Sequence, residues 1–243
     1  MLSHIAGQGV LSGMRIVVLG ANGPTGRHVV AMGVEAGHDV VAVTRRPEGF
    51  PVAGAEVVGA DVRDPAALGP VVRGADAVLS ALGVPFSKEA VDVYSVGGRN
   101  VVDAMREHGV GRLAVVTSSV MGPHPEPQGG VVFRRLVQPY VVNTLGRTLY
   151  EDMRRLEALV ADSGLDWTIV RPSGLFDHDR VTDYTTGEDH VLGRFTSRRD
   201  LADLLLAQAT SDTWVKKVVG VATTAVRPSM VSLIWREGIR KKP

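Results

Sequence analysis

The sequence of 243 residues contains no cysteine, which excludes disulfide bonds, cysteine-ligated metal sites and a thiolate nucleophile. It also lacks an excess of charge of either sign, since 27 Lys and Arg stand against 26 Asp and Glu, a formal net charge of +1. No apolar run reaches the roughly 18–20 residues that a membrane-spanning helix needs. We therefore expect a small-molecule substrate, and neither a nucleic acid nor a membrane as a partner.

The first 13 residues, MLSHIAGQGVLSG, lack a basic region followed by a continuous apolar one. They do not resemble a secretory signal, so we expect a cytoplasmic protein. We interpret 1–13 as a flexible leader and 227–243, which carries a short basic run, as a solvated tail. The remaining composition is ordinary for a globular domain except for glycine, whose 28 copies exceed the usual share of about 7%.

Apolar, β-branched runs alternate with helical patterns along almost the whole chain. This alternation predicts an α/β fold of the Rossmann type, a doubly wound, mainly parallel sheet with helices on both faces. We expect a single domain over 14–226, whose last third supplies a substrate lobe. The expected strands are 15–19, 39–44, 55–59, 75–82, 112–117, 166–170 and 218–222, and the expected helices are 26–36, 65–73, 91–108, 147–163 and 199–209. Asp64 is placed as the N-cap of the helix 65–73, and Gly37 and Gly109 as the stops of the helices 26–36 and 91–108.

The sharpest motif is the glycine loop GANGPTGR, which lies directly between a predicted strand and a predicted helix. Gly20 permits a tight turn off the strand, Gly23 lets the backbone approach a pyrophosphate, and Gly26 lets the helix pack closely. The helix N-terminus then offers free N–H groups and a partial positive charge to the phosphates. The motif indicates dinucleotide binding; the alternative is a structural loop.

The end of the second strand bears on which dinucleotide binds. An NAD site usually offers an acidic residue there, but this chain has Arg45 and Arg46. Because an arginine pairs with a 2′-phosphate that an acid would repel, we favour NADP(H) as the cofactor. The alternative is that both are surface arginines. Asp61, after the third strand, is either a cap on the adenine edge or a turn residue.

Seven segments occur in an order that resembles a known family: GANGPTGRHVV, VAVTRRP, GADVRDP, AVLSALG, GGRNVVDAM, VVTSS and SGLDWTIVRPSG. Over about residues 14–225 the chain resembles the NmrA-like, atypical short-chain dehydrogenase/reductase family, and within it the biliverdin-IXβ reductase/flavin reductase branch. The resemblance implies a Rossmann fold with NADP(H) across the carboxyl ends of the strands.

The resemblance also assigns residues to parts of the cofactor. The glycine loop would hold the pyrophosphate, Arg45 the 2′-phosphate, and the residues after the later strands the adenine, ribose and nicotinamide. Asn100 matches a polar helix position that supports the strand ends. The predicted cofactor-binding residues are Gly20, Ala21, Asn22, Gly23, Pro24, Thr25, Gly26, Arg45, Arg46, Asp61, Val62, Ala81, Leu82, Gly83, Thr117, Pro172 and Ser173.

Classical members of the superfamily use a Tyr-x-x-x-Lys pair, in which tyrosine donates a proton and lysine lowers its pKa. The nearest match here is Tyr150 with Arg154. Counting back from SGLDW places the two positions that hold this Tyr and Lys in the family at Leu149 and Met153 instead. Tyr150 therefore lies one residue out of register with them. An apolar stripe of Leu149, Met153, Leu156 and Val160 marks the buried face of this helix, with Tyr150 on its flank. We weigh a proton-donor role for Tyr150 against a packing role, and favour packing.

Ser118 is the better catalytic candidate, because the matching serine of the resembled branch contributes to the substrate site. The alternative is a strand-end serine that satisfies local backbone. That branch has a histidine where this chain has Ser173, which weakens the case for a biliverdin-type substrate. His124, His178 and His190 lie in predicted loops without helix-spaced partners, so we expect no metal site.

Three other expectations concern the surroundings of the site. We expect Asp152 and Arg155 to form surface pairs. We hypothesise that residues 131–149 form a mobile lid over the nicotinamide, with Gly129-Gly130 as its hinge. The apolar stretch 230–235 is compatible with packing on a second subunit, so a homodimer is one of the states that we consider.

Three functions are compatible with these residues. The first is an NADPH-dependent reductase of a small conjugated acceptor, such as a flavin or quinone, which takes its proton from water. The second is an NADP(H)-sensing regulator with little or no catalysis. The third, an isomerase or epimerase, is the least favoured because the tyrosine is out of place.

Overall fold

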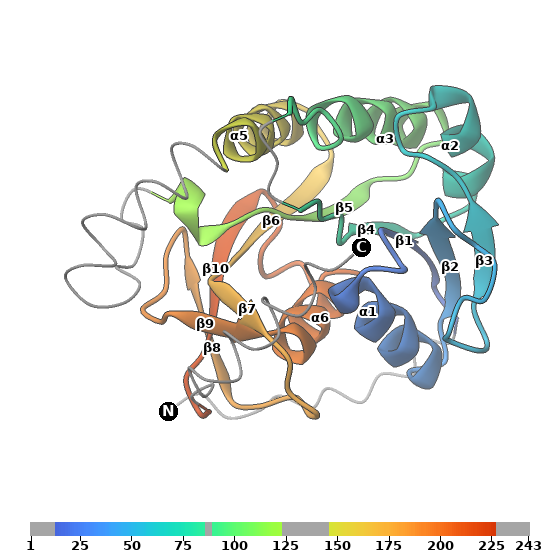
Figure 1. Ribbon diagram of the computed structural model, residues 1–243. Coiled ribbons are helices and arrows are strands. Elements are labelled where there is room, and N and C mark those ends of the chain that lie inside the picture. Colours follow the sequence, from blue (N-terminus) through green and yellow to red (C-terminus); the bar gives the residue numbers. More distant parts are fainter. Residues whose placement is uncertain (1–12, 86–88, 123–145, 227–243) are drawn as a thin grey trace.

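The computed structural model describes residues 13–85, 89–122 and 146–226 (Figure 1). A sheet of eight strands runs through it in the order β3-β2-β1-β4-β5-β6-β10-β8, and every neighbouring pair is parallel except β10 with β8. The strands are β1 (Arg15–Leu19), β2 (Asp39–Thr44), β3 (Glu56–Gly59), β4 (Ala77–Ser80), β5 (Arg112–Val116), β6 (Asp166–Pro172), β8 (Tyr184–Glu188) and β10 (Lys217–Thr223).

Helices cover both faces of this sheet, as Figure 1 shows, with α2, α3 and α5 on one side and α1 and α6 on the other. Their bounds are α1 (Pro24–Glu35), α2 (Pro65–Val72), α3 (Ser95–Glu107), α5 (Arg147–Ala161) and α6 (Arg198–Ala207). The predicted Rossmann-type architecture is confirmed. Strand order reverses between β1 and β4, which is where ligands bind in folds of this class.

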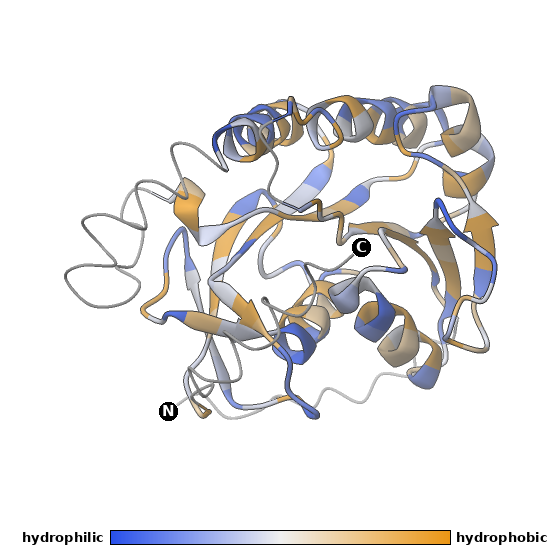
Figure 2. Cartoon of the chain, in the orientation of Figure 1, coloured by the Kyte–Doolittle hydropathy of each residue, from blue (hydrophilic) through white to orange (hydrophobic). Residues whose placement is uncertain are grey.

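Each face of the sheet carries its own apolar core, because successive residues of a strand point to opposite sides. In β1, Val17 and Leu19 belong to the core under α2, α3 and α5, and Ile16 and Val18 to the core over α1 and α6. Figure 2 shows the apolar colouring concentrated on the strands and on the helix sides that face them. Burial on both faces explains why the central strands are continuous apolar runs in the sequence.

Local signals in the sequence set most of the element ends. Asp64 caps α2 by accepting a hydrogen bond from the Ala66 N–H at 3.0 Å, as predicted, and Pro65 occupies the first helical position. Gly37 and Gly109 follow α1 and α3 with positive φ angles, which confirms them as helix stops.

The region between β6 and α6 differs from the prediction, which treated it as a loop. It contains β7 (Gly174–Phe176) and β9 (Phe195–Ser197), which pair with each other, and β8 at the edge of the main sheet. These strands are three to five residues long and β8 reads YTTGE, so they carry no apolar run to reveal them. His178 and His190 lie just outside these strands.

Several predictions fall outside the described residues. These are the leader up to residue 12, the hinge at 129–130, His124, most of the lid and the apolar stretch in the C-terminal tail.

Candidate functional site

The glycine loop lies where β1 and β4 end side by side. Gly20 has a φ of +74°, and a Cβ on it would lie 2.8 Å from the carbonyl oxygen of Ala81. A Cβ on Gly26 would overlap the carbonyl oxygen of Gly20. Both positions therefore require glycine, one for the turn and one for close packing of α1, which confirms these two expectations. The role of Gly23 at a pyrophosphate stays a prediction.

The N-terminus of α1, which this loop leads into, has no side-chain cap. Gly23 occupies the N-cap position and Pro24 begins the helix. By contrast α2 is capped by Asp64, α6 by Ser197, and α3 by a carboxylate from another helix, whereas α5 also begins at a glycine without a side-chain cap. The first N–H groups of α1 and the positive end of its dipole thus lie beside the carboxyl ends of β1 and β4. A diphosphate fits this feature, because it supplies the acceptor oxygens that the helix end lacks.

Asn22 connects the glycine loop to two arginines. Its Oδ1 accepts hydrogen bonds from Nε and Nη2 of Arg27 at 2.9 and 2.6 Å, and its Nδ2 lies 3.5 Å from the carbonyl oxygen of Arg46. The buried hydroxyl of Thr44 accepts from the Arg46 N–H at 3.1 Å and fixes the turn after β2. Arg45 and Arg46 themselves are exposed. The structure thus gathers three arginines at one corner of the sheet.

Asp61 lies at the same corner, and its carboxylate is bound by the neighbouring Arg63. Arg63 binds its carboxylate with Nε at 3.2 Å and Nη2 at 2.8 Å, and also donates its backbone N–H. These hydrogen bonds from Arg63 lower the pKa of Asp61 to about 2. Asp61 therefore remains an anion that is locally neutralised, and its bonds to Arg63 shape a turn; its role at an adenine stays a prediction.

Two further predicted segments follow β4 and β3. Ala81, Leu82 and Gly83 follow β4, and a Cβ on Gly83 would meet open space. The side chain of Val62 is buried in the core, and its carbonyl oxygen accepts a hydrogen bond from Nδ2 of Asn100 at 3.1 Å. Asn100 thus supports a strand end, as the sequence predicted.

The ends of β5 and β6 lie on the other side of the switch point. Ser118 is half-buried, and its Oγ accepts a hydrogen bond from the Val120 N–H at 3.3 Å, so its own O–H is left to donate. Pro172 and Ser173 are buried. The Ser173 hydroxyl donates to the carbonyl oxygen of Gly193 at 2.8 Å, which ties this strand end to the β8–β9 loop. Ser118 is therefore the more available hydroxyl.

Apolar side chains occupy the two positions where classical members of the superfamily carry Tyr and Lys. Leu149 and Met153 are buried, together with Leu156 and Val160, on the core side of α5, as the sequence pattern predicted. Tyr150 also belongs to this core, with 8% of its surface exposed, and burial raises the pKa of its phenol. Arg154 is exposed. This arrangement supports packing as the role of Tyr150 and makes it a weaker proton donor.

A largely buried ion pair that the sequence reasoning missed lies beside Ser118. Arg171, on β6, donates Nε and Nη2 to the two carboxylate oxygens of Glu157, on α5, at 3.0 and 2.7 Å. The Thr117 hydroxyl donates to the same carboxylate at 2.7 Å, so the side chain of this predicted cofactor-binding residue is directed at Glu157. The side chains of Arg171 and Glu157 are only 11% and 13% exposed. An arginine in an otherwise apolar strand is the signal that such a partner exists.

The expectation for Asp152 was wrong. Its side chain is fully buried, and its carboxylate accepts hydrogen bonds from the backbone N–H groups of Tyr94 and Ser95 and from the Ser95 hydroxyl. It thereby caps α3 from α5, a long-range contact that helix periodicity cannot reveal. Its expected ion pair with Arg155 does form, at 3.2 Å.

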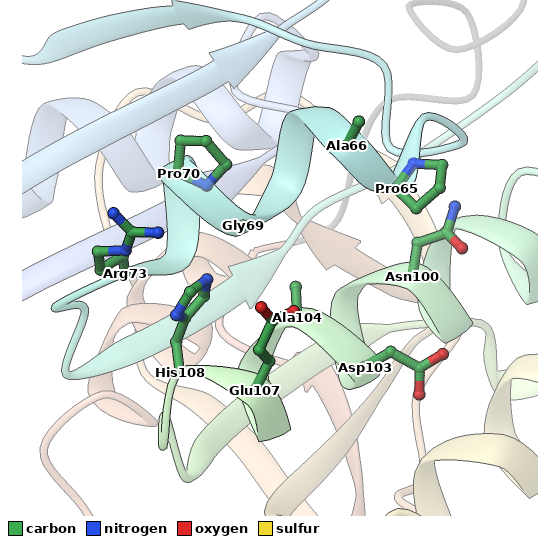
Figure 3. A pocket seen from close by; sticks show the side chains of 10 residues that line it. All are labelled: Pro65, Ala66, Gly69, Pro70, Arg73, Asn100, Asp103, Ala104, Glu107 and His108. Carbon is green, nitrogen blue, oxygen red and sulfur yellow. The ribbon is translucent and has the colours of Figure 1, made fainter.

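Other features of the described residues offer little chemistry. They contain no group of three His, Asp or Glu side chains able to hold a metal ion, and no helix long and apolar enough to cross a membrane. A hollow of about 350 Å³ lies between α2 and α3, and Figure 3 shows Arg73 and His108 toward one end of it and Asn100 toward the other. None of its lining residues belongs to the glycine loop or to a strand end, where ligands of this fold class bind.

Comparison with known proteins agrees with this geometry. A family described as NAD(P)H-binding matches residues 20–212. An uncharacterized protein of Mycobacterium bovis is 33% identical over 164 residues, 67% of this chain, which spans only 15% of that relative's length. An uncharacterized sugar epimerase of Bacillus subtilis is 28% identical over 202 residues, 80% of this chain and 87% of that protein.

Solved structures show the same fold. The anaerobilin reductase ChuY of Escherichia coli O157:H7 superposes with a TM-score of 0.70 at 20% identity, covering 89% of this chain and all of that one. A putative NAD-dependent epimerase/dehydratase of Bacillus halodurans gives a TM-score of 0.67 at 22% identity, covering 92% of this chain and all of that one. With an uncapped helix behind a loop that requires glycine, at the strand-order switch point, the chain belongs to the NAD(P)H-binding family of Rossmann-fold proteins.

Proposed function

We propose that the protein is an NADPH-dependent oxidoreductase that transfers a hydride to a small conjugated acceptor of the flavin or quinone class. The observation that carries the proposal is the uncapped N-terminus of α1 behind a loop in which Gly20 and Gly26 leave no room for a side chain. When bound there, the nicotinamide cofactor supplies the hydride. The protein's own contribution is to bind, orient and shield the reactants.

The corner at the end of β2 supports NADPH over NADH. Arg45 and Arg46 follow Thr44 in place of an acidic residue. The nearby carboxylate of Asp61 is already bound by Arg63, so it repels an incoming phosphate less than a free carboxylate would. A 2′-phosphate gains charge-assisted hydrogen bonds from arginine that a 2′-hydroxyl does not.

The side chains at the ends of β5 and β6 support a conjugated acceptor. Reduction of a simple ketone needs a proton donor, but the columns that would hold one are Leu149 and Met153, and Tyr150 is buried with a raised pKa. A flavin or quinone delocalises the incoming charge and takes its proton from water. Ser118 then acts by donating a hydrogen bond to an acceptor oxygen or ring edge. The likeness in fold to a protein described as an anaerobilin reductase favours a reductase over the other candidate functions.

The direct test is NADPH oxidation, followed by its absorbance, with FMN, FAD, a benzoquinone and biliverdin as separate acceptors. We expect turnover with at least one of them, lowered about ten- to a hundred-fold in Ser118→Ala by loss of one hydrogen bond to developing charge. Ser119→Ala, the neighbouring hydroxyl, is the matched control. Tight NADPH binding without turnover of any acceptor would contradict the reductase.

That outcome would favour the second candidate, an NADP(H)-sensing regulator with little catalysis. One observation speaks for it: the side chains in the Tyr and Lys columns are apolar and buried, so the classical acid–base pair is missing. A cytoplasmic location and a homodimer remain part of the proposal, to be tested by fractionation and by light scattering.

A further inference from the structure

Arg27 is held in place by a neutral partner. It is the residue after the third glycine and lies in the first turn of α1, exposed to solvent. Its Nε and Nη2 both donate to Oδ1 of Asn22, at 2.9 and 2.6 Å. Among the described residues its Nη1 has no hydrogen-bond partner. The amide fixes the guanidinium group without cancelling its charge, and it leaves one nitrogen free to donate.

The charge of this corner is not balanced by nearby acids. In the part of the chain that the structure describes, no carboxylate lies within 4.0 Å of the guanidinium groups of Arg27, Arg45 or Arg46. Asp61, which is close enough to Arg45 for its pKa to be affected, is bound by Arg63. Nδ2 of Asn22 lies 3.5 Å from the Arg46 carbonyl oxygen, so the group that positions Arg27 also borders the turn after β2.

We propose that Arg27, oriented by Asn22, is a specificity-determining residue that binds the 2′-phosphate of NADPH together with Arg45. This inference rests on the proposed function, because it assumes that the adenosine half of a nicotinamide cofactor lies over this corner. A preorganised guanidinium loses little conformational entropy on binding, and a doubly charged phosphoryl group matches its donors. The competing role for Arg27 is to brace the glycine loop, which would serve NADPH and NADH equally.

The ratio of dissociation constants for NADPH and NADH separates the two roles, and nicotinamide fluorescence measures it without an acceptor substrate. In Arg27→Gln we expect NADPH binding to weaken about ten- to a hundred-fold and NADH binding to change less than about two-fold. Arg73→Gln is the control, since this exposed arginine lines the hollow between α2 and α3, away from the glycine loop and the strand ends, and it should leave the ratio unchanged.

Asn22→Asp sharpens the test, because it keeps or strengthens the hold on Arg27 while neutralising its charge. We expect the NADPH preference to fall about as far as in Arg27→Gln. If Arg27 only braces the loop, Asn22→Asp should keep the ratio of the unmodified protein. Circular dichroism melts check that each variant is folded.

The outcomes separate this inference from the proposed function. Equal weakening of both cofactors in Arg27→Gln, or an unchanged ratio in both variants, would overturn the role of Arg27 alone. If the unmodified protein binds NADH as tightly as NADPH, the NADPH preference fails and the assignment of Arg27 fails with it.

Discussion

Arg171 and Arg27 are both held through Nε and Nη2, but their partners differ. Arg171 binds the carboxylate of Glu157 inside the protein, next to the end of β5, whereas Arg27 binds the amide of Asn22 at the surface. A carboxylate neutralises a buried guanidinium, so that pair serves to hold elements together. An amide leaves the charge in place for a ligand. The same geometry therefore serves structure at one site and binding at the other.

The largest effect should come from breaking the buried pair on one side only. Arg171→Met leaves the largely buried Glu157 carboxylate with only the Thr117 hydroxyl as a partner, and we expect it to lower the free energy of unfolding by about 3 kcal/mol. Urea denaturation at pH 7 measures this. The double variant Arg171→Met/Glu157→Leu should recover most of the loss. Arg27→Met should change stability by less than about 0.5 kcal/mol, and an equal loss there would contradict the comparison.

A smaller effect should follow from removing the third hydrogen-bond donor to the Glu157 carboxylate, which is the Thr117 hydroxyl. Thr117→Val keeps the shape of the side chain but removes the hydrogen bond to Glu157, and we expect a loss of about 1–2 kcal/mol in the free energy of unfolding. Thr148→Val is the control: its hydroxyl donates to the backbone carbonyl oxygen of Glu89 at 2.8 Å and to no buried charge, so the change should cost less. A Thr117→Val protein as stable as the unmodified one would mean that Arg171 alone satisfies the carboxylate.

Salt should weaken cofactor binding at the exposed arginine corner and leave the stability contributed by the Glu157–Arg171 pair nearly unchanged. Raising KCl from 0.05 to 0.5 M shortens the screening length well below 10 Å, so we expect NADPH binding to weaken several-fold more than NADH binding. The stability loss caused by Arg171→Met should stay nearly constant over the same range. Parallel titrations of both cofactors provide the measurement, and equal salt dependence would argue against a charged 2′-phosphate site.

The smallest effect concerns Asp61. Its pKa is about 2 in the folded protein against an ordinary value of 3.8, because Arg63 donates to its charged form. The stability that it contributes is therefore present above about pH 4 and is lost as the pH falls toward 2. Arg63→Gln should return the pKa toward the ordinary value, which an NMR titration of the carboxylate detects. An unchanged pKa would mean that the backbone N–H of Arg63 dominates.

What the sequence predicted well depended on neighbours along the chain. The strand–glycine loop–helix unit, the cap at Asp64 and the apolar columns of α5 all lie within a few residues of the signals that reveal them. The single-domain organisation and the roles of most predicted site residues stay predictions.

What it missed depended on contacts between distant elements. The Glu157–Arg171 pair needs the register of α5 against β6, and Asp152 caps a helix more than fifty residues earlier in the chain. Asn22 and Arg27 are close in sequence, but their bond needs the turn that Gly20 makes against Ala81. The strands β7, β8 and β9 are too short and polar to carry a pattern.

The contact between Gly20 and Ala81 also sets an order of events during synthesis. Part of the loop is held by β2, since the Ala21 N–H donates to the Val43 carbonyl oxygen at 3.1 Å, but the packing of Gly20 on Ala81 needs Leu19 and Ser80 to be paired. Such long-range parallel pairing is slow to form, so a nascent chain that ends before β4 lacks this last contact of the glycine loop. A ligand that binds the finished loop stabilises only chains that have passed this stage. Binding of the cofactor would thus favour chains that have completed this part of the fold, in addition to supplying the hydride.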